Sequence, residues 1–336
     1  MSAILVTGGC GYIGSHCALS LFDSGYDVII LDDFSTGSPS IGKSLESSSE
    51  RIRIAEGSLL IPADIDQIFD NGDIGAVIHL AGSSQVAESV SDPGKYYRNN
   101  VVGTVNLLES MRLHGIGKIV FSSSAAVYGE PEYVPIDESH PLNPINPYGM
   151  SKLIVERILE DYDRAYGMKS VRLRYFNAAG ADSKGRAGEC HEPETHLIPC
   201  IIRSVLDGNS KFSLFGDDYD TRDGTCVRDY VNVEDLAEAH LLALRHLDAG
   251  GESGSFNLGT SSGSTVKEVL AACEKTMGKP VPTEIRSRRQ GDPAILIADN
   301  RKAREILGWE PKRTLEDSVR TAYAWELRRR GLTSSP

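Results

Sequence analysis

The sequence predicts an α/β fold with a doubly wound parallel sheet, because short runs of β-branched and apolar residues alternate with longer segments of helical period. Each run is continuously apolar rather than alternating, which is typical of parallel strands that helices cover on both faces. Helices are expected between most of these strands. The predicted strands span residues 4–7, 28–32, 52–55, 76–81, 118–122 and 171–176.

The pattern changes after about residue 178. A loop rich in glycine, acidic residues and histidine occupies residues 180–194, and a helix is expected near residues 196–206. A hairpin-like region over residues 212–222 follows this helix. We therefore expect a second, smaller α+β domain over residues 179–336.

One later segment resembles the first half of the chain again. It contains a strand-like run over residues 229–233 and a helical pattern over residues 233–247. We expect residues 228–247 to return to the large α/β domain, which otherwise spans residues 1–178.

Composition excludes several classes of protein. The chain has 336 residues and a formal net charge of −12, which disfavours a nucleic-acid surface as its main function. No apolar run approaches the roughly 18 residues that a membrane span needs. The first predicted strand begins at once, so we expect no secretory signal, and the six cysteines are scattered without a C-x-x-C pair. These features predict a cytoplasmic protein.

A glycine loop follows the first predicted strand and opens a helix. Gly8, Gly11 and Gly14 are spaced as G-x-x-G-x-x-G within residues 7–14. Glycine permits the tight turn and the close approach of backbone N–H groups to a pyrophosphate, at the positive end of the helix. The position of the loop after a strand is the context that this motif requires. We therefore predict a dinucleotide site in a Rossmann domain.

The choice of dinucleotide follows from the end of the second predicted strand. Asp32 ends this strand roughly 20 residues beyond the loop, where an acid accepts hydrogen bonds from the adenosine ribose. A second carboxylate at Asp33, with no basic residue before Lys43, repels a 2′-phosphate. The sequence therefore favours NAD over NADP.

Candidate reacting groups occur on one predicted helix and on the strand before it. Asn146 can cap this helix, and Tyr148 and Lys152 share one of its faces at i, i+4 spacing. The strand ends in a run of serines that includes Ser124. Because open α/β sheets bind ligands at the carboxyl ends of their strands, a hydroxyl there can orient a substrate alcohol beside the tyrosine.

These motifs occur in an order that resembles the extended short-chain dehydrogenase/reductase family. They are the glycine loop, the serine strand end, Tyr-x-x-x-Lys and the run Arg174-Tyr175-Phe176-Asn177. The likeness runs from Ala3 to about Leu315 and is closest to the epimerases that act on UDP-sugars. It includes residues 87–90, 99–101, 194–199, 224–230, 257–259 and 288–292.

The resemblance implies an NAD-dependent isomerase that interconverts UDP-glucose and UDP-galactose. Such an enzyme inverts sugar carbon 4 through a transient 4-keto intermediate while the cofactor stays bound. Tyr148 would take the proton from the 4-hydroxyl, Lys152 would bind the nicotinamide ribose and lower the pKa of the tyrosine, and Ser124 would assist. The implied homodimer would pair segments 94–114 and 147–166 of each subunit.

The resemblance also implies two sets of binding residues. Contacts to NAD are expected from the glycine loop, the strand ends and the reacting helix: Gly8, Gly11, Tyr12, Ile13, Gly14, Asp32, Ala81, Asn99, Tyr148, Lys152 and Tyr175. Contacts to the UDP-sugar are expected from the second half of the chain: Asn177, His196, Leu197, Ser213, Phe215, Arg228, Arg289, Asp292 and Leu296.

Four positions depart from the best-known pattern of these epimerases. Ser58 stands where an aspartate usually meets adenine, and Ser84 where a lysine often reaches the cofactor phosphates. Ala126 replaces a threonine beside the hexose, and Leu296 lines the 2-position of the sugar. The first two departures predict weaker retention of NAD. The last two leave the preferred sugar open.

Three alternative functions follow from the same residues. The first is 4-epimerisation of UDP-N-acetylglucosamine, UDP-xylose or UDP-glucuronate. The second is a non-catalytic NAD-binding regulator, which would have no use for Tyr148 together with Lys152. The third is a metal enzyme, since Glu189, His191 and His196 lie in one loop with Cys190, Glu192 and Glu194. This loop lacks a paired ligand spacing, and we predict no metal. Dehydration is disfavoured, because residues 125–126 are alanines where dehydratases carry an acid.

Overall fold

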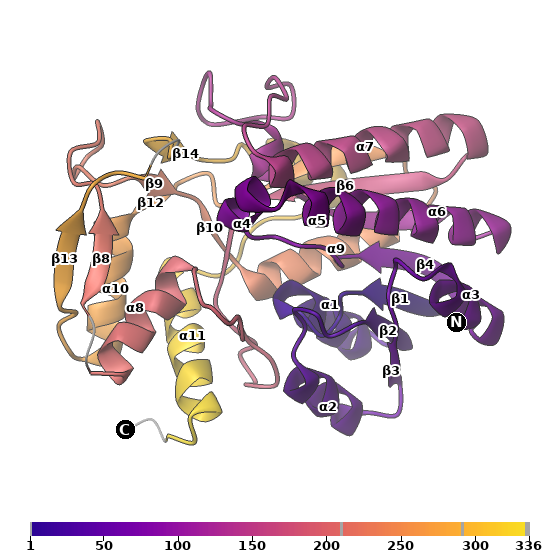
Figure 1. The fold of residues 1–336 in the computed structure, drawn as a ribbon, viewed down its shortest axis with the longest axis horizontal. Coiled ribbons are helices and arrows are strands. Elements are labelled where there is room, and N and C mark those ends of the chain that lie inside the picture. The colour runs from indigo at the N-terminus through magenta and orange to yellow at the C-terminus, as the bar shows by residue number, and fades with distance from the viewer. Residues whose placement is uncertain (1, 209–210, 290–291, 333–336) are drawn as a thin grey trace.

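The computed structural model describes residues 2–208, 211–289 and 292–332. A seven-stranded parallel sheet with strand order β11-β6-β5-β4-β1-β2-β3 forms its centre (Figure 1). The predicted doubly wound fold is therefore confirmed. The strands are β1 (Ala3–Thr7), β2 (Val28–Asp32), β3 (Ile52–Glu56), β4 (Ile74–His79), β5 (Lys118–Ser124), β6 (Lys169–Tyr175) and β11 (Gly254–Leu258).

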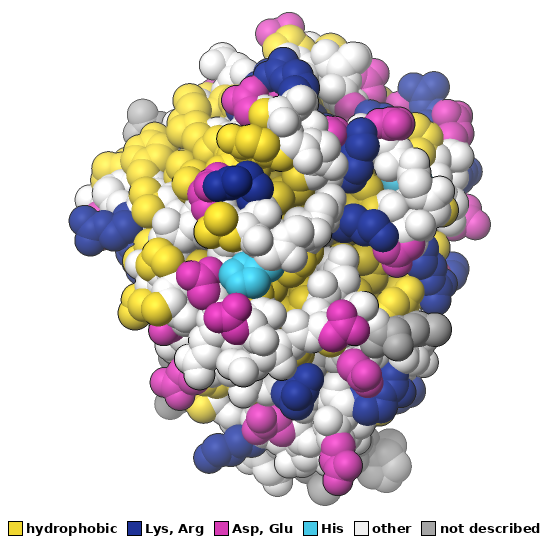
Figure 2. Space-filling view, turned by 90° about the vertical axis from the view of Figure 1, so that its right-hand side faces the viewer, with side chains coloured by type: hydrophobic (Ala, Val, Ile, Leu, Met, Phe, Trp, Pro, Cys, Tyr) yellow, Lys and Arg dark blue, Asp and Glu magenta, His cyan; other side chains and the backbone are white. Residues whose placement is uncertain are grey.

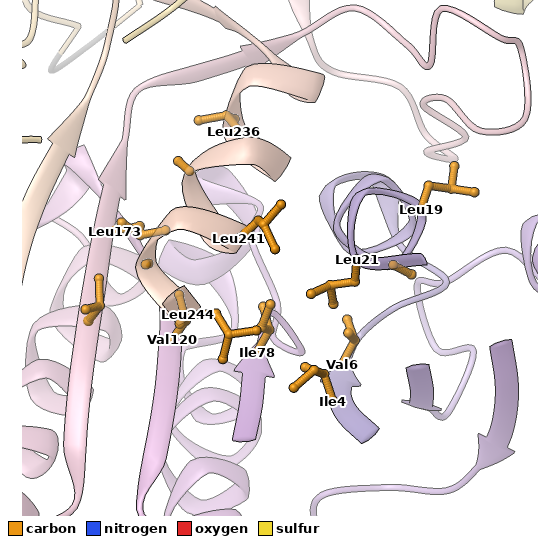
Figure 3. Close-up of a cluster of buried hydrophobic side chains, with 14 of the residues drawn as sticks. Ile4, Val6, Leu19, Leu21, Ile78, Val120, Leu173, Leu236, Leu241 and Leu244 are labelled. Atoms are coloured by element: carbon orange, nitrogen blue, oxygen red, sulfur yellow. The ribbon is translucent and has the colours of Figure 1, made fainter. Parts of the chain in front are cut away.

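Helices cover both faces of this sheet. On one face, the helices α1 (Tyr12–Asp23), α2 (Pro39–Ser48) and α9 (Val233–Asp248) contribute to one apolar cluster with the strands. Figure 3 shows part of this cluster, with Leu21 of α1 near Val6 and with Leu244 of α9 near Val120. On the other face, α3 (Pro62–Asn71), α6 (Gly103–Leu113) and α7 (Pro147–Tyr166) contribute to a second cluster.

The remaining helices join these layers or lie beyond them. The segment that leads to α6 consists of α4 (Val86–Ser91), α5 (Pro93–Tyr96) and the π-helical η1 (Tyr97–Val102). Three helices stand to the left of the sheet in Figure 1: α8 (Leu197–Leu206), α10 (Val266–Met277) and α11 (Leu315–Arg329). They share a third apolar cluster. A short 3-10 helix, η2 (Ala125–Val127), follows β5. The π-helical η3 (Ala303–Leu307) ends before Gly308.

Small sheets occupy the second half of the chain. The strand β7 (Asn177–Ala179) pairs with β10 (Tyr230–Asn232), and β9 (Val227–Arg228) pairs with β12 (Ser264–Thr265) and β14 (Ile295–Leu296). The hairpin-like region predicted over residues 212–222 is wrong. Its strand β8 (Phe212–Phe215) pairs instead with the distant β13 (Thr283–Arg286), and the pairing is parallel. A parallel pair needs a long crossover, so local sequence could not reveal it.

The strand predicted over residues 229–233 is present as β10, and Asp229 lies just before it, between β9 and β10. The buried carboxylate of Asp229 accepts hydrogen bonds from the backbone N–H groups of Thr260 at 2.7 Å and Ala298 at 3.1 Å. Asp229 thereby connects β10 to the loops that contain Thr260 and Ala298. The predicted helix over 233–247 is present as α9, and β11 adds a further strand to the large sheet that the sequence did not suggest.

A buried histidine at the end of β4 makes stability depend on pH. The hydroxyl of Thr104 donates its hydrogen to the carbonyl of Asn100, so it can only accept from His79. Nε2 of His79 therefore carries the hydrogen and donates to Thr104 at 2.8 Å. Nδ1 of the same ring accepts from the hydroxyl of Thr7 at 2.7 Å. Burial, reinforced by the charge of Lys152, lowers the pKa of His79 to about 3.

We expect this histidine to destabilise the fold in acid. Its folded pKa lies below the unfolded value of about 6.5, so the unfolded chain binds more protons between these two pH values. Stability is therefore lost as pH falls through this window. Between pH 7.5 and 5, the wild type should lose about 2 kcal/mol more unfolding free energy than His79→Gln. Urea unfolding at both pH values measures this, and equal losses would contradict it.

Candidate active site

One cavity of about 390 Å³ lies at the carboxyl ends of the central strands. The chain places β2 on one side of β1 and β4 on the other, so the cavity sits at the switch point where α/β sheets bind ligands. All the predicted cofactor residues line its wall, as does Ser124. Of the predicted substrate residues, Asn177, His196, Arg228 and Leu296 line it as well.

The glycine loop between β1 and α1 forms a cradle at this cavity. Gly8 has φ +70°, and a Cβ on it would lie 2.7 Å from the backbone nitrogen of Ala81. A Cβ on Gly14 would lie 2.1 Å from the carbonyl oxygen of Gly8. The helix begins at Tyr12 after Gly11, with uncharged residues in its first turn, so its N–H groups and positive end suit an anion. The cradle therefore fits the pyrophosphate of a dinucleotide.

Asp32 lies where the sequence places it, at the end of β2 and on the cavity wall. Its two carboxylate oxygens accept hydrogen bonds from the N–H groups of Cys10 at 2.8 Å and Phe34 at 2.9 Å. Each oxygen keeps a further lone pair, with which it can accept from a ribose hydroxyl. Burial raises the pKa of Asp32 despite these hydrogen bonds. The site of the adenosine ribose is therefore prepared by the backbone around it.

The segment after β2 contributes wall residues that the sequence analysis did not single out. Ser35, Thr36 and Gly37 line the cavity. A Cβ on Gly37 would lie 2.5 Å from Oδ1 of Asp32, so the chain needs glycine there to approach the carboxylate. The signal in the sequence that could have identified this segment was Gly37, a glycine shortly after Asp32.

The π-helical segment η1 brings Asn99 to the opposite wall. Its side-chain amide donates to Ser83 Oγ at 3.1 Å. The neighbouring Asn100 is buried, and it donates to Ser151 Oγ at 2.9 Å and accepts from the N–H of Ser83 at 2.8 Å. These bonds connect the loop after β4 to α7, the helix that carries the candidate reacting groups.

Tyr148 and Lys152 face the same cavity from the first turns of α7. Asn146 caps this helix through a 2.8 Å hydrogen bond from the N–H of Gly149. The ammonium of Lys152 lies 5.8 Å from the ring centroid of Tyr148 and donates to the carbonyl oxygen of Ser122 at 2.9 Å. The tyrosine and the lysine are therefore neighbours, as their spacing predicts.

The electrostatics of Tyr148 differ from the expectation that Lys152 lowers its pKa. Burial raises the pKa of Tyr148, and the hydrogen bond with Ser124 only opposes the rise. Burial likewise lowers the pKa of Lys152 to about 8. The reason is that both side chains leave water together, and desolvation disfavours the charged form of each. The protein alone therefore keeps Tyr148 as a neutral phenol near neutral pH.

Ser122 is a site residue that the sequence analysis missed. Its hydroxyl hydrogen-bonds the phenol of Tyr175, and its carbonyl accepts from Lys152. Burial raises the pKa of Tyr175, which keeps this phenol neutral. The run of three serines at the end of β5 was the signal, but only Ser124 was chosen from it.

Five predicted substrate residues lie outside the cavity wall: Leu197, Ser213, Phe215, Arg289 and Asp292. Asp292 instead forms an ion pair with Arg228, whose own side chain reaches the wall. The guanidinium of Arg289 stacks 4.2 Å from the ring centroid of Phe215. The hydroxyl of Ser213 donates to Glu284 at 3.0 Å. Of these five residues, Arg289 and Phe215 contact each other, and Asp292 is linked to the cavity wall through Arg228.

The loop before α8 gathers four of the six potential metal ligands that the sequence shows there. The ligand atoms of Glu189, His191, Glu194 and His196 lie within 4.8 Å of one another. Glu192 instead pairs with Arg203 at 3.2 Å. Both histidines of this cluster line the cavity.

Comparisons with known proteins agree with this geometry. The profile of the NAD dependent epimerase/dehydratase family matches residues 4–259. The UDP-glucose 4-epimerase of Halalkalibacterium halodurans is 50% identical over 324 residues, which cover 96% of this chain and 95% of that protein.

Two solved structures share the fold. The UDP-glucose 4-epimerase of Brucella ovis in complex with NAD has a TM-score of 0.91 at 45% identity, covering 96% of this chain and 98% of the other. The enzyme of Bifidobacterium longum in complex with NAD⁺ and UDP has a TM-score of 0.91 at 39% identity, covering 97% and 98%. The expected resemblance is therefore confirmed, and the chain belongs to the NAD dependent epimerase/dehydratase family.

Proposed function

We propose that this chain is an NAD-dependent epimerase that interconverts UDP-glucose and UDP-galactose. The observation that carries this proposal is that Tyr148, Lys152 and Ser124 line the same cavity as the glycine cradle and Asp32. The relatives and structures above have the same activity in their names, and two of those structures hold NAD. The function rests on this site and not on the fold alone.

In this proposal, Tyr148 removes the proton from the sugar 4-hydroxyl. Bound NAD accepts and returns the hydride and adds a positive charge near the phenol. Making a tyrosine a base near neutral pH requires a shift of roughly 3 pKa units, or about 4 kcal/mol. A cation roughly 5 to 6 Å from a phenolate contributes about 3 kcal/mol at an effective dielectric of 20. Lys152 alone therefore does not offset the burial that raises the pKa of Tyr148, and the positive charge of bound NAD would have to supply the rest.

Ser124 and Ser122 orient these groups. Ser124 lines the cavity with Tyr148 and lowers the pKa of the phenol, against the effect of burial. Ser122 holds the ammonium of Lys152 through its carbonyl. For inversion, the 4-keto sugar must present its opposite face while the nucleotide stays bound, so we assign the firm contacts to Asn177, Arg228 and His196.

The cavity favours epimerisation over dehydration. Among the described residues, the only carboxylates on its wall are those of Asp32 and Asp33, which belong to the adenosine end. Ala125 and Ala126, the residues after Ser124, line the wall without a carboxylate. Loss of a sugar hydroxyl needs an acid to protonate it, whereas inversion at carbon 4 does not.

The preferred sugar is decided near Leu296. This side chain lies in register with Arg228 across β14 and β9 and reaches the cavity wall. A branched side chain there restricts the space at the 2-position of the hexose. We therefore place UDP-glucose and UDP-galactose ahead of the N-acetylated sugars, with UDP-xylose and UDP-glucuronate as further alternatives.

We assign the uridine end of the substrate to residues beyond the wall: Leu197, Ser213, Phe215, Arg289 and Asp292. The pair of Arg289 and Phe215 and the pair of Arg228 and Asp292 lie where a bound diphosphate would meet two guanidinium groups. This assignment goes with the proposed division into a cofactor domain over residues 1–178, joined by 228–247, and a substrate domain over 179–336.

We also propose a homodimer formed through α6, α7 and the segment η1, which packs against α7. Large apolar side chains on these elements are exposed, including Val102 at 49%, Leu113 at 69% and Tyr166 at 58%. Figure 2 shows hydrophobic side chains gathered at the upper left of one face, while charges of both signs are scattered over the rest. Exposed apolar patches of this kind suit protein association.

A cytoplasmic location is proposed on the state of the cysteines. All six lie within the described ranges and are free, as expected in a reducing compartment. None of the helices in the described part of the chain is long and apolar enough to cross a membrane.

The proposed function is tested with purified protein and UDP-galactose, without added NAD. We expect UDP-glucose to form, and the N-acetylated and pentose analogues to react more slowly. Chromatography of the nucleotide sugars measures each product. Conversion of none of these sugars, either without NAD or after NAD is added, would contradict the proposal and leave a binding role.

A further inference from the structure

Glu189 occupies an unusual position beside the cavity. Its side chain is only 6% exposed, and its backbone carbonyl accepts a 3.0 Å hydrogen bond from the indole of Trp325 on α11. The oxygen Oε1 accepts from Nδ1 of His191 at 2.9 Å and also from Nδ1 of His196. One buried carboxylate thus holds two imidazole rings.

The orientation of the two rings follows from these contacts. Because Nδ1 of each ring faces Glu189, Nε2 lies on the other side of the ring. In the described part of the chain, neither Nε2 has a hydrogen-bond partner, and both His191 and His196 line the cavity. Their ring centroids are 5.2 Å apart. Nε2 of each ring is therefore open to a ligand, and it donates a hydrogen bond to that ligand when the ring is protonated.

The surrounding charges keep His196 protonated. Burial disfavours its charge, but the carboxylates of Glu189 and Glu194 outweigh this and raise the pKa of His196 to about 10. Glu194 lies 3.5 Å from Nδ1 of His196, and Arg203 of α8 lies 3.6 Å from Glu194. Among the other charged groups around this cluster, Glu192 of the loop and Glu326 of α11 lie 3.2 and 3.6 Å from Arg203. Arg329 of α11 lies 3.0 Å from Glu326 and 3.8 Å from Glu192.

Few cationic side chains line the cavity. The only lysine or arginine side chains on the described wall are Lys152 and Arg228, and Arg228 is already paired with Asp292. The ligands of the proposed function carry two diphosphates, and the chain as a whole has a net charge of −12. A protonated histidine with a free N–H is therefore valuable here.

We propose that Glu189 is a positioning residue that holds His196 as a charged donor, with its Nε2–H directed to the diphosphate of the UDP-sugar. This inference rests on the proposed function, because it requires a nucleotide diphosphate in the cavity. Glu189 itself does not touch the substrate. It fixes both the direction of the His196 ring and its charge.

The same four side chains argue against a metal ion. A divalent cation bound among them would have to displace the protons that both Nδ1 atoms donate to Glu189. Arg203 already supplies a positive charge at Glu194, so two carboxylates face one arginine and one protonated histidine. Both carboxylates therefore already face a positive charge without a metal.

The test compares binding of UDP and of uridine to the holoenzyme by calorimetry, at pH 6 and pH 8.5. Glu189→Gln keeps the size of the side chain but removes its charge. We expect its affinity for UDP to match the wild type within about twofold at pH 6 and to fall about tenfold below it at pH 8.5. Binding of uridine should not change, because uridine lacks the diphosphate.

Two further variants complete the design. Glu192→Gln, a change in the same loop that leaves the two histidines untouched, should bind UDP like the wild type. His196→Asn should lose UDP affinity at both pH values, and adding Glu189→Gln to it should cost little more. This pair keeps the test valid if Glu189→Gln alone folds poorly.

Each result is decisive. Equal UDP affinity of Glu189→Gln and the wild type at pH 8.5 would overturn the inference, as would an equal loss for uridine. Stoichiometric metal in the purified protein, with loss of UDP binding on chelation, would also overturn it. Failure of the wild type to bind UDP at all would instead contradict the proposed function.

Discussion

Replacing Tyr148 by phenylalanine should reduce kcat for epimerisation by at least about 10³-fold, because the positioned proton acceptor is removed. The phenyl ring keeps the T-shaped contact with Tyr96, whose ring centroid is 6.3 Å away, so the fold should persist. Bound NAD should remain, since the glycine cradle and Asp32 are untouched. Turnover is measured with UDP-galactose, and bound cofactor by its release on denaturation.

Tyr166→Phe is the matched control for this variant. Tyr166 lies at the end of the same helix and is 58% exposed, far along α7 from the cavity. It should retain wild-type turnover. If Tyr148→Phe kept a substantial part of kcat, Tyr148 would have no role in the proton transfer.

Replacing Gly14 by alanine should abolish the retention of NAD, with a loss of affinity of at least about 100-fold. The added Cβ would lie 2.1 Å from the carbonyl oxygen of Gly8 and 2.8 Å from Cα of Gly9. Both atoms belong to the backbone of the cradle, so the turn itself must open. The cofactor content of the purified variant and its NAD titration measure the effect.

Gly117→Ala serves as the control for this change. Nothing lies within 4 Å of a Cβ at Gly117, so alanine there should leave cofactor content unaltered. Thermal unfolding of both variants separates loss of the cradle from loss of the fold. Normal NAD content in Gly14→Ala would mean that the pyrophosphate does not depend on this turn.

The features that the sequence predicted correctly are those that depend on neighbouring residues alone. The glycine loop, Asp32 at the end of β2 and the cap of α7 at Asn146 all occur where expected. Tyr148 and Lys152 meet because a helix places i and i+4 on one face. None of these requires knowledge of a distant residue.

Strand β11 was not predicted because it contains a buried asparagine, Asn257, whose hydrogen-bond partners are distant in the sequence. Asn257 accepts from the phenol of Tyr128 at 2.6 Å, and its backbone N–H donates to Glu138 at 2.7 Å. Its side-chain amide donates to the carbonyl of Ile136 at 2.9 Å. A fully buried asparagine is tolerated only when such bonds are made, and they come from segments more than 100 residues away.

The electrostatics of the site were equally beyond the sequence. The i, i+4 spacing predicts that Lys152 and Tyr148 are close, but it does not give the burial that raises the pKa of the tyrosine. The loop composition shows Glu189, His191 and His196 together, but not that one carboxylate oxygen serves both rings. Both properties depend on how loops pack at the sheet edge.

The central claim is that hydride leaves sugar carbon 4 and returns to it within one bound complex. Its most direct test uses UDP-galactose with deuterium at carbon 4, incubated with the purified protein in ordinary water. We predict that the UDP-glucose formed retains the deuterium at carbon 4, as mass spectrometry and NMR would detect. Replacement of that deuterium by solvent hydrogen would contradict the claim.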